Sequence, residues 1–311
     1  MARLSKRRRQ ELAGPDTSLP AAAAVARPPR HRPQPARVAS PWWQSPWAWG
    51  SGVLALVAVV VAVIIVVGLA GGPGTSIATS PPPASVLRAV TGVNPGVSSS
   101  VGSGGIANPL QPAPGSPAPL SASKPELVFV GADSCPYCAA ERWALVVALS
   151  RFGAFEHLGV TTSSSTDVYP NTPTFTFYGA TYTSPYVTFT AFETTDRAGN
   201  PLQTPTARVQ ELVTTYDPPS TSCPSGACIP FQDLDNHYIL LGSAVSPQLL
   251  HGMTWKGIAA TLGNPRSPVA KAIIGDANWI TAGVCRLTAD RPASACSAAP
   301  IPALEGQLGS T

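Results

Sequence analysis

The sequence predicts a single α/β domain that follows a long N-terminal segment. A run without any polar side chain, Val53–Ala70, precedes the domain. A short apolar run of strand type, Glu126–Gly131, leads through a turn into a segment with helical spacing, and further β-type runs such as Thr174–Tyr178 follow it. Strand-type and helix-type segments that alternate in this way are typical of α/β domains. We therefore expect one domain over residues 123–300, with an additional β-rich insertion between residues 155 and 206.

Charge is divided unevenly along the 311 residues. Residues 1–40 contain nine Lys and Arg against Glu11 and Asp16, a net charge of +7, whereas the rest holds 11 basic and 14 acidic residues, a net charge of −3. Nucleic-acid binding needs basic side chains that cluster on the folded part of a protein. Because the part that we expect to fold is mildly acidic, we predict that nucleic acid is not a partner.

The N-terminal segment has the pattern of a membrane anchor. Residues 1–48 are predicted to be a disordered, basic tail, because their Arg, Pro and Ala residues offer little to bury. Residues 49–70 are predicted to be a transmembrane helix, since ~20 apolar residues cross a hydrocarbon core of ~30 Å. The positive charge before the span places the N-terminus in the cytoplasm and exports the rest of the chain. A cleaved signal peptide is the alternative, but the basic region before the span is unusually long for one.

Two further segments are predicted to lie outside the folded domain. Residues 71–122 consist largely of Pro, Gly and Ser, and Arg88 is their only charged residue. Such a composition is typical of a flexible linker. Residues 301–311 are predicted to be a C-terminal tail.

The Cys-Pro-Tyr-Cys motif is the strongest chemical signal in the chain. Cys135 and Cys138 come directly after the predicted strand and turn, and they open the predicted helix. Unpaired N–H groups at a helix N-terminus stabilise a thiolate and lower its pKa. We therefore predict that Cys135 attacks a disulfide and that Cys138 resolves the product, a reaction that needs no cofactor.

The other four cysteines are predicted to form structural disulfides, because all six follow the span and exported thiols are usually oxidised. Cys223 and Cys228 enclose a short loop with Pro and Gly; a second redox pair is the alternative. Cys285 and Cys296 would join a helix near residues 268–287 to the C-terminal segment, contributing about 3 kcal/mol. The spacings C-x2-C and C-x4-C would also suit a zinc site, but we predict no metal, because zinc ribbons do not place their CxxC before a long apolar helix.

Two stretches, GADSCPYCAAERWALVVALSRFG and DVYPNTPTFTFYGATYTSPYVTF, resemble the membrane-anchored thioredoxin-like family described as domain-of-unknown-function family 929. The resemblance covers about residues 123–300, and the CPYC motif itself is similar to that of glutaredoxins. It implies a thioredoxin-like fold with a cis-proline beside the CxxC motif. Pro230 is preferred to Pro173, because a hairpin strand, His237–Leu241, and a helix follow it. Ile229 and Pro230 are then expected to align the backbone of a substrate.

The chain departs from the thioredoxin pattern at two positions. The buried Asp that thioredoxin keeps six residues before its first active-site cysteine is Phe129 here, and the Trp before the motif is Ser134. Both differences favour an oxidase, an isomerase or a glutaredoxin-like role over a strongly reducing one.

The sequence therefore predicts a membrane-anchored, extracytoplasmic thiol–disulfide oxidoreductase. Its partners would be exported proteins that contain cysteine, the lipid around one helix, and a membrane protein that restores its redox state. The first alternative is a non-catalytic exported binding or scaffold domain, in which CPYC is a structural disulfide. The second alternative is a metal-binding module.

Overall fold

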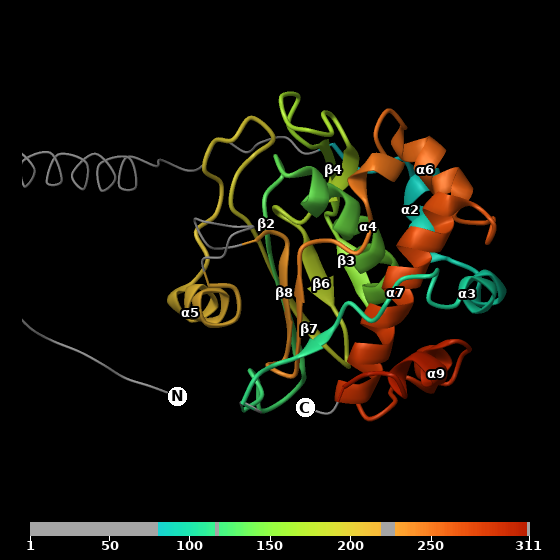
Figure 1. Ribbon diagram of the computed structural model, residues 1–311. Helices are drawn as coiled ribbons and strands as arrows, with labels where there is room; N and C mark the ends of the chain where they lie inside the picture. Colours follow the sequence, from blue (N-terminus) through green and yellow to red (C-terminus); the bar gives the residue numbers. More distant parts are fainter. Residues whose placement is uncertain (1–79, 116–117, 219–227, 310–311) are drawn as a thin grey trace, which may run out of the picture. The chain divides into compact units, whose positions relative to one another are not determined.

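The computed structural model describes residues 80–115, 118–218 and 228–309, all of which belong to one compact unit, Ser76–Thr311 (Figure 1). The predicted tail (1–48), the predicted span (49–70) and the start of the predicted linker lie outside the described residues. Within the described part of the chain, no helix is long and apolar enough to cross a membrane.

A five-stranded sheet with the strand order β1-β9-β8-β2-β7 forms the centre of the unit. β2 pairs in parallel with β7 and antiparallel with β8, so that Val128 lies between Thr190 and Asp233. All six residues of β2 are buried, which explains why its sequence is apolar without alternation. The strands are β1 (Gln111–Pro112), β2 (Glu126–Gly131), β7 (Thr188–Glu193), β8 (Phe231–Leu234) and β9 (Tyr238–Leu241).

Helices cover both faces of this sheet and make a three-layered α/β/α arrangement (Figure 1). Successive side chains of a strand point to opposite faces. Phe129 accordingly belongs to the core under α4 and α7, whereas Val128 packs with Val209 of α5 on the other face. The helices concerned are α4 (Pro136–Leu149), α5 (Ala207–Tyr216), η2 (Pro247–Leu249), α6 (Trp255–Thr261) and α7 (Pro268–Leu287). The predicted order of strand, turn and helix around the CxxC motif is confirmed.

The predicted β-rich insertion is confirmed in part. Two small antiparallel sheets lie here, β4 with β5 and β3 with β6, but the last strand of the region, β7, belongs to the main sheet. Trp143 of α4 donates a hydrogen bond from its indole N–H to the carbonyl oxygen of Pro173, at 2.9 Å, and fastens β5 to the core. The four strands are β3 (Ala154–Glu156), β4 (Gly159–Thr162), β5 (Pro173–Thr176) and β6 (Thr181–Thr183).

The prediction of a flexible linker over residues 71–122 is wrong for its described part. This segment forms α2 (Ala84–Thr91), α3 (Pro95–Val101) and the edge strand β1. Val86 and Val90 of α2 are fully buried in the main core. The folded unit therefore begins well before residue 123.

The small residues of this segment serve close packing, which is why composition alone was misleading. Gly104 has a φ of +66°, and a Cβ atom there would lie 2.0 Å from the carbonyl oxygen of Lys271. In the same contact, a Cβ atom on Gly275 of α7 would lie 2.4 Å from the carbonyl oxygen of Ser103. Only glycine allows two backbones to approach so closely, so the glycines here bring the loop after α3 against α7.

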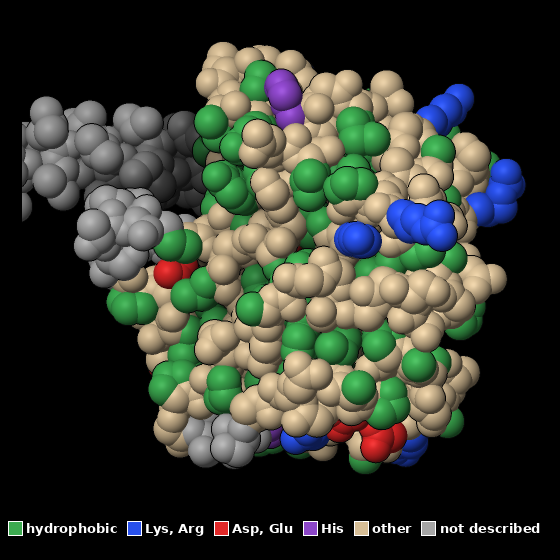
Figure 2. Space-filling view, turned by 45° about the vertical axis from the view of Figure 1, so that its right-hand side comes forward, with side chains coloured by type: hydrophobic (Ala, Val, Ile, Leu, Met, Phe, Trp, Pro, Cys, Tyr) green, Lys and Arg blue, Asp and Glu red, His purple; other side chains and the backbone are tan. Residues whose placement is uncertain are grey.

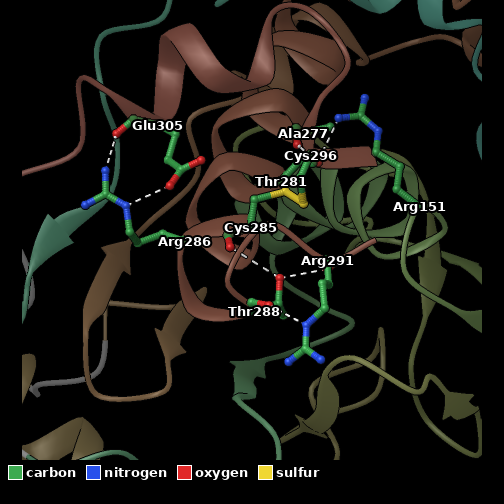
Figure 3. Close-up of a disulfide and its surroundings, with 9 residues drawn as sticks. All are labelled: Arg151, Ala277, Thr281, Cys285, Arg286, Thr288, Arg291, Cys296 and Glu305. Atoms are coloured by element: carbon green, nitrogen blue, oxygen red, sulfur yellow. Dashed lines mark hydrogen bonds and ion pairs between the residues drawn. A yellow bond between two sulfur atoms is a disulfide. The ribbon is translucent and has the colours of Figure 1, made fainter. Parts of the chain in front are cut away.

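The prediction of a C-terminal tail over residues 301–311 is also wrong for its described part. Residues Ile301–Glu305 form α9, and Ile301, Leu304 and Leu308 are buried. Arg286 Nε donates a 2.8 Å hydrogen bond to Glu305 Oε1, which ties α9 to α7 (Figure 3). The predicted disulfide between Cys285 of α7 and Cys296 of α8 (Ala293–Cys296) is present, with an S–S distance of 2.04 Å.

The burial of α2 predicts that it contributes to stability. Val86→Ala should lower the free energy of unfolding by about 2 kcal/mol, because two methyl groups leave a closely packed core. Val168, which is 66% exposed, offers a matched control: Val168→Ala should change the free energy of unfolding by less than about 0.5 kcal/mol. Urea unfolding of the purified full-length chain measures both, and equal effects would contradict the packing of α2.

Candidate active site

The two cysteines of the motif occupy the first turn of α4. Cys135 is the N-cap residue, and its sulfur accepts a hydrogen bond from the backbone N–H of Cys138 at 3.3 Å. Pro136 occupies the first helical position, where the missing N–H costs nothing. Both thiols are free; Cys135 is partly exposed, whereas Cys138 is fully buried.

The surroundings give the two thiols opposite acidities. The hydrogen bond from the Cys138 thiol, assisted by backbone N–H groups and the charge of Arg142, lowers the pKa of Cys135 from 9.0 to about 7 in spite of its partial burial. Burial, together with the neighbouring Cys135, raises the pKa of Cys138 well above its ordinary value. The site therefore combines a partly exposed thiol of lowered pKa with a buried thiol of raised pKa.

A cis peptide bond lies directly beside Cys135. It joins Ile229 to Pro230, the residue before β8. The sulfur of Cys135 is 3.8 Å from the carbonyl oxygen of Ile229. The structure thus brings together the two predicted substrate-binding residues and the predicted nucleophile. Pro173, the rival candidate, is not among the prolines with a cis bond in the described residues.

A buried ion pair lies behind the motif, and the sequence analysis missed it. Arg142 of α4 is completely buried; its Nε donates a 2.8 Å hydrogen bond to Glu193 Oε1, and its Nη2 pairs with Glu193 Oε2. Arg142 Nη2 also lies 3.5 Å from Asp133 Oδ1. The signal that could have revealed the pair is the presence of charged residues in otherwise apolar segments, because charged side chains are rarely buried without a partner.

The carboxyl group of Asp133 is the third member of this cluster. It accepts a hydrogen bond from Thr176 Oγ1 at 3.1 Å and is buried just before the motif. Burial raises its pKa to about 7, although the charge of Arg142 opposes the shift. Glu193 and Asp133 hold the pKa of Arg142 above its ordinary value against the effect of burial. The ring centroid of Phe129 lies 5.7 Å from Arg142 Cζ.

A pair of buried carboxyl groups connects α4 with α7. Glu141 accepts hydrogen bonds from Gln232 Nε2 of β8, at 2.7 Å, and from Ser243 Oγ, at 2.9 Å. Asp276 of α7 is its buried neighbour, and burial raises the pKa of both carboxyl groups. Because both pKa values are raised, the pair binds a proton more readily than exposed carboxylates do. Gln232 links it to the strand that follows Pro230.

A row of three rings begins inside the motif. Tyr137, inside the motif, is 44% exposed and makes an edge-on contact with Tyr169, with 6.4 Å between ring centroids. Tyr169 in turn lies 6.3 Å from the ring of His251. This row of rings offers apolar contact area next to Cys135.

The predicted disulfide between Cys223 and Cys228 lies partly outside the described residues. Cys228 is disulfide-bonded, and its backbone N–H donates to the carboxylate of Asp217. Cys223 lies outside the described residues. In the part that the structure describes, no group of three or more His, Cys, Asp or Glu side chains is placed to hold a metal ion.

Comparison with known families adds one assignment. The model of a family described as a domain of unknown function (DUF929) matches residues 115–286, more than half of the chain. The chain belongs to this family. The matched region contains β2, the CxxC motif, the cis-proline and nearly all of α7. No curated protein and no solved structure matches the sequence significantly.

The buried ion pair predicts a large effect when one partner is removed. Arg142→Met should lower the free energy of unfolding by about 3–5 kcal/mol, because it leaves Glu193 buried without a counter-charge. Arg286→Met, which breaks the exposed pair with Glu305, is the matched control and should cost about 1 kcal/mol or less. The double variant Arg142→Met/Glu193→Gln should regain part of the loss. If Arg142→Met loses no more free energy of unfolding in urea than Arg286→Met does, the buried pair does not stabilise the fold as expected.

Proposed function

We propose that this protein is a thiol–disulfide oxidoreductase with a thioredoxin-like fold that acts on exported proteins. The observation that carries the proposal is the position of Cys135. Its sulfur caps a helix, has a pKa of about 7 and lies 3.8 Å from the carbonyl oxygen that precedes the cis-proline. A partly exposed thiol with these surroundings is a nucleophile near neutral pH.

The arrangement of elements supports the thioredoxin-like assignment. β2 leads through a turn into the CxxC helix, and the cis-proline begins a β-hairpin, β8–β9, with further helices after it. These are the features that the resemblance noted in the sequence implies. α2, α3 and the two small sheets are additions to that pattern.

The proposed reaction is an exchange in two steps. The Cys135 thiolate attacks one sulfur of a substrate disulfide; a bond forms to that sulfur, and the other substrate sulfur leaves as a thiolate that takes up a proton. Cys138 then loses its proton and attacks Cys135, which forms the Cys135–Cys138 disulfide and releases the second substrate thiol. The substrate is reduced and the motif oxidised; the reverse sequence oxidises a dithiol substrate.

The backbone beside Pro230 suits the alignment of a substrate chain. Ile229 and Pro230 lie next to the sulfur of Cys135, so that an extended segment held against them would bring its own sulfur to the nucleophile. Tyr137 and Tyr169 would add apolar contacts on the motif side. We propose exported cysteine-containing proteins as the substrates.

The proposed location rests on the sequence. The basic segment before Val53–Ala70 favours a single span with the N-terminus in the cytoplasm and the catalytic domain outside. The Cys285–Cys296 disulfide suits an oxidising compartment. A membrane protein would then restore the redox state of the motif after each turnover.

The acidity of Cys135 predicts the pH dependence of its reactivity. The rate of its alkylation by iodoacetamide should rise with pH and reach half of its maximum near pH 7, because only the thiolate reacts. An unshifted thiol with a pKa of 9.0 would be only about 1% ionised at pH 7. Mass spectrometry of the reduced full-length chain measures alkylation at Cys135, and a midpoint near pH 9 would contradict the proposed nucleophile.

The division of roles between the two cysteines predicts a trapped intermediate. Cys138→Ala should accumulate a mixed disulfide between Cys135 and its substrate, because no resolving thiol remains. Cys135→Ser/Cys138→Ala, the matched control, should trap nothing, and Cys135→Ser alone should abolish insulin reduction. Non-reducing electrophoresis of membranes from cells that express each variant detects the complexes.

The scaffold alternative makes a different prediction about the motif. A structural CPYC disulfide should have a reduction potential below about −300 mV, whereas an exchanging one lies above that value. Titration of the motif with glutathione buffers distinguishes them. The proposed activity would be rejected if the reduction potential lay below this limit and Cys138→Ala accumulated no mixed disulfide.

A further inference from the structure

A pocket of about 210 Å³ opens near the Cys285–Cys296 disulfide, on parts of the fold that the proposed reaction does not use. Its walls come from the α2–α3 connection, α3, the residue after the C-cap of α4, and the α8–α9 segment. The lining is mostly small and apolar, with two hydroxyl groups and a single charged side chain, that of Arg151. The other lining side chains include Val93, Pro95, Ser98, Ser294, Ala298 and Ile301.

Arg151 is held rigidly at this pocket by neutral partners. Its Nη1 donates to Thr281 Oγ1 at 2.7 Å, and its Nη2 donates to Asn278 Oδ1 at 2.9 Å and to Ser98 Oγ at 3.2 Å. Figure 3 shows the side chain directed toward Thr281, close to the disulfide. Its Nε makes no hydrogen bond within the described residues. The guanidinium thus keeps one N–H group without a protein partner among the described residues, on a side chain that lines the pocket.

No carboxylate in the described residues balances the charge of Arg151. Arg142, Arg208 and Arg286 each pair with an acidic side chain, but Arg151 forms no such pair. Burial alone lowers the pKa of Arg151 to about 10, without any acidic neighbour to oppose it. Arg151 is only partly exposed, so its charge has less water around it than that of a surface arginine and no counter-ion, which a bound anion would supply.

We propose that this pocket binds a small organic monocarboxylate, with its carboxylate against Arg151 and a short apolar chain among the alanine, valine and proline side chains. One guanidinium balances one negative charge, whereas a phosphate dianion would require more cationic or N–H donors than the lining supplies. The volume is below the ~300–1,000 Å³ of pockets for drug-sized ligands, so the ligand has few atoms.

The pocket is connected mechanically to the disulfide. Ser294 and Ala295 of α8 line the pocket, and Cys296 of the same short helix is bonded to Cys285 of α7. Asn278 and Thr281, which hold Arg151, also belong to α7. The disulfide thus joins α7, the helix that orients the guanidinium, to the α8–α9 segment that forms part of the pocket wall.

The shape of the site favours a small ligand over a protein partner. On the face that Figure 2 presents, hydrophobic side chains are scattered and form no single broad patch. A recess with one oriented charge selects for a compact ligand.

The test is binding of simple carboxylates to the full-length chain. Sodium butyrate should bind saturably in calorimetry and raise the melting temperature at constant ionic strength, with sodium acetate weaker because it lacks the apolar chain. Butyramide, of the same shape but neutral, should bind at least tenfold more weakly, and sodium phosphate should not compete with butyrate.

Two variants test the charge of Arg151 and the free volume of the pocket separately. Arg151→Met should weaken butyrate binding at least tenfold and still fold, because Ser98, Asn278 and Thr281 keep hydrogen bonds among themselves and to the backbone. Ala298→Leu should also abolish binding, by filling the pocket while Arg151 stays. Arg266→Met, which removes an exposed arginine, should bind as the unaltered chain does. The proposal would be overturned if no carboxylate bound saturably, if butyramide bound as tightly as butyrate, or if only phosphate bound. Full affinity for butyrate in Arg151→Met or Ala298→Leu would also overturn it.

Discussion

The buried pair of Arg142 and Glu193 is the interaction on which the candidate active site depends. It joins the second turn of α4 to the last residue of β7, beside the end of β2. A buried charge without its partner would destabilise the fold by several kcal/mol, so this pairing restricts how the helix can lie on the sheet. The start of α4, where Cys135 and Cys138 lie, is positioned as a consequence. The same guanidinium favours the thiolate of Cys135.

Two buried acidic residues flank the CxxC motif in the sequence, whereas Phe129 of β2 contributes a buried apolar ring. Asp133, with a pKa of about 7, and Glu141 lie on the turn before the motif and on the helix after it. Because both pKa values are raised, groups that bind a proton readily lie on the elements next to the motif.

The sequence predicted the local parts of the site well. The apolar strand, the turn, the CxxC helix and the disulfide of Cys285 with Cys296 each follow from a short segment or a spacing. Pro230 was preferred to Pro173 because of the residues after it, and the cis bond lies there. Arg142 and Glu193 were missed because their side chains meet across 51 positions of sequence. The folding of α2 and α3 was not predicted, because glycine and serine are common both in flexible linkers and at close contacts between packed segments.

The sequence by itself determined where the apolar strand β2 lies, where the helix α4 begins, and that two cysteines stand at its N-terminus. Those properties depend on neighbours in the chain. Only the tertiary structure decided that Cys135 lies beside Ile229, that Arg142 has a buried carboxylate partner and that Arg151 has none. Burial, counter-charges and the close approach of Gly104 to α7 are contacts between distant segments, and they exist only after the layers have packed together.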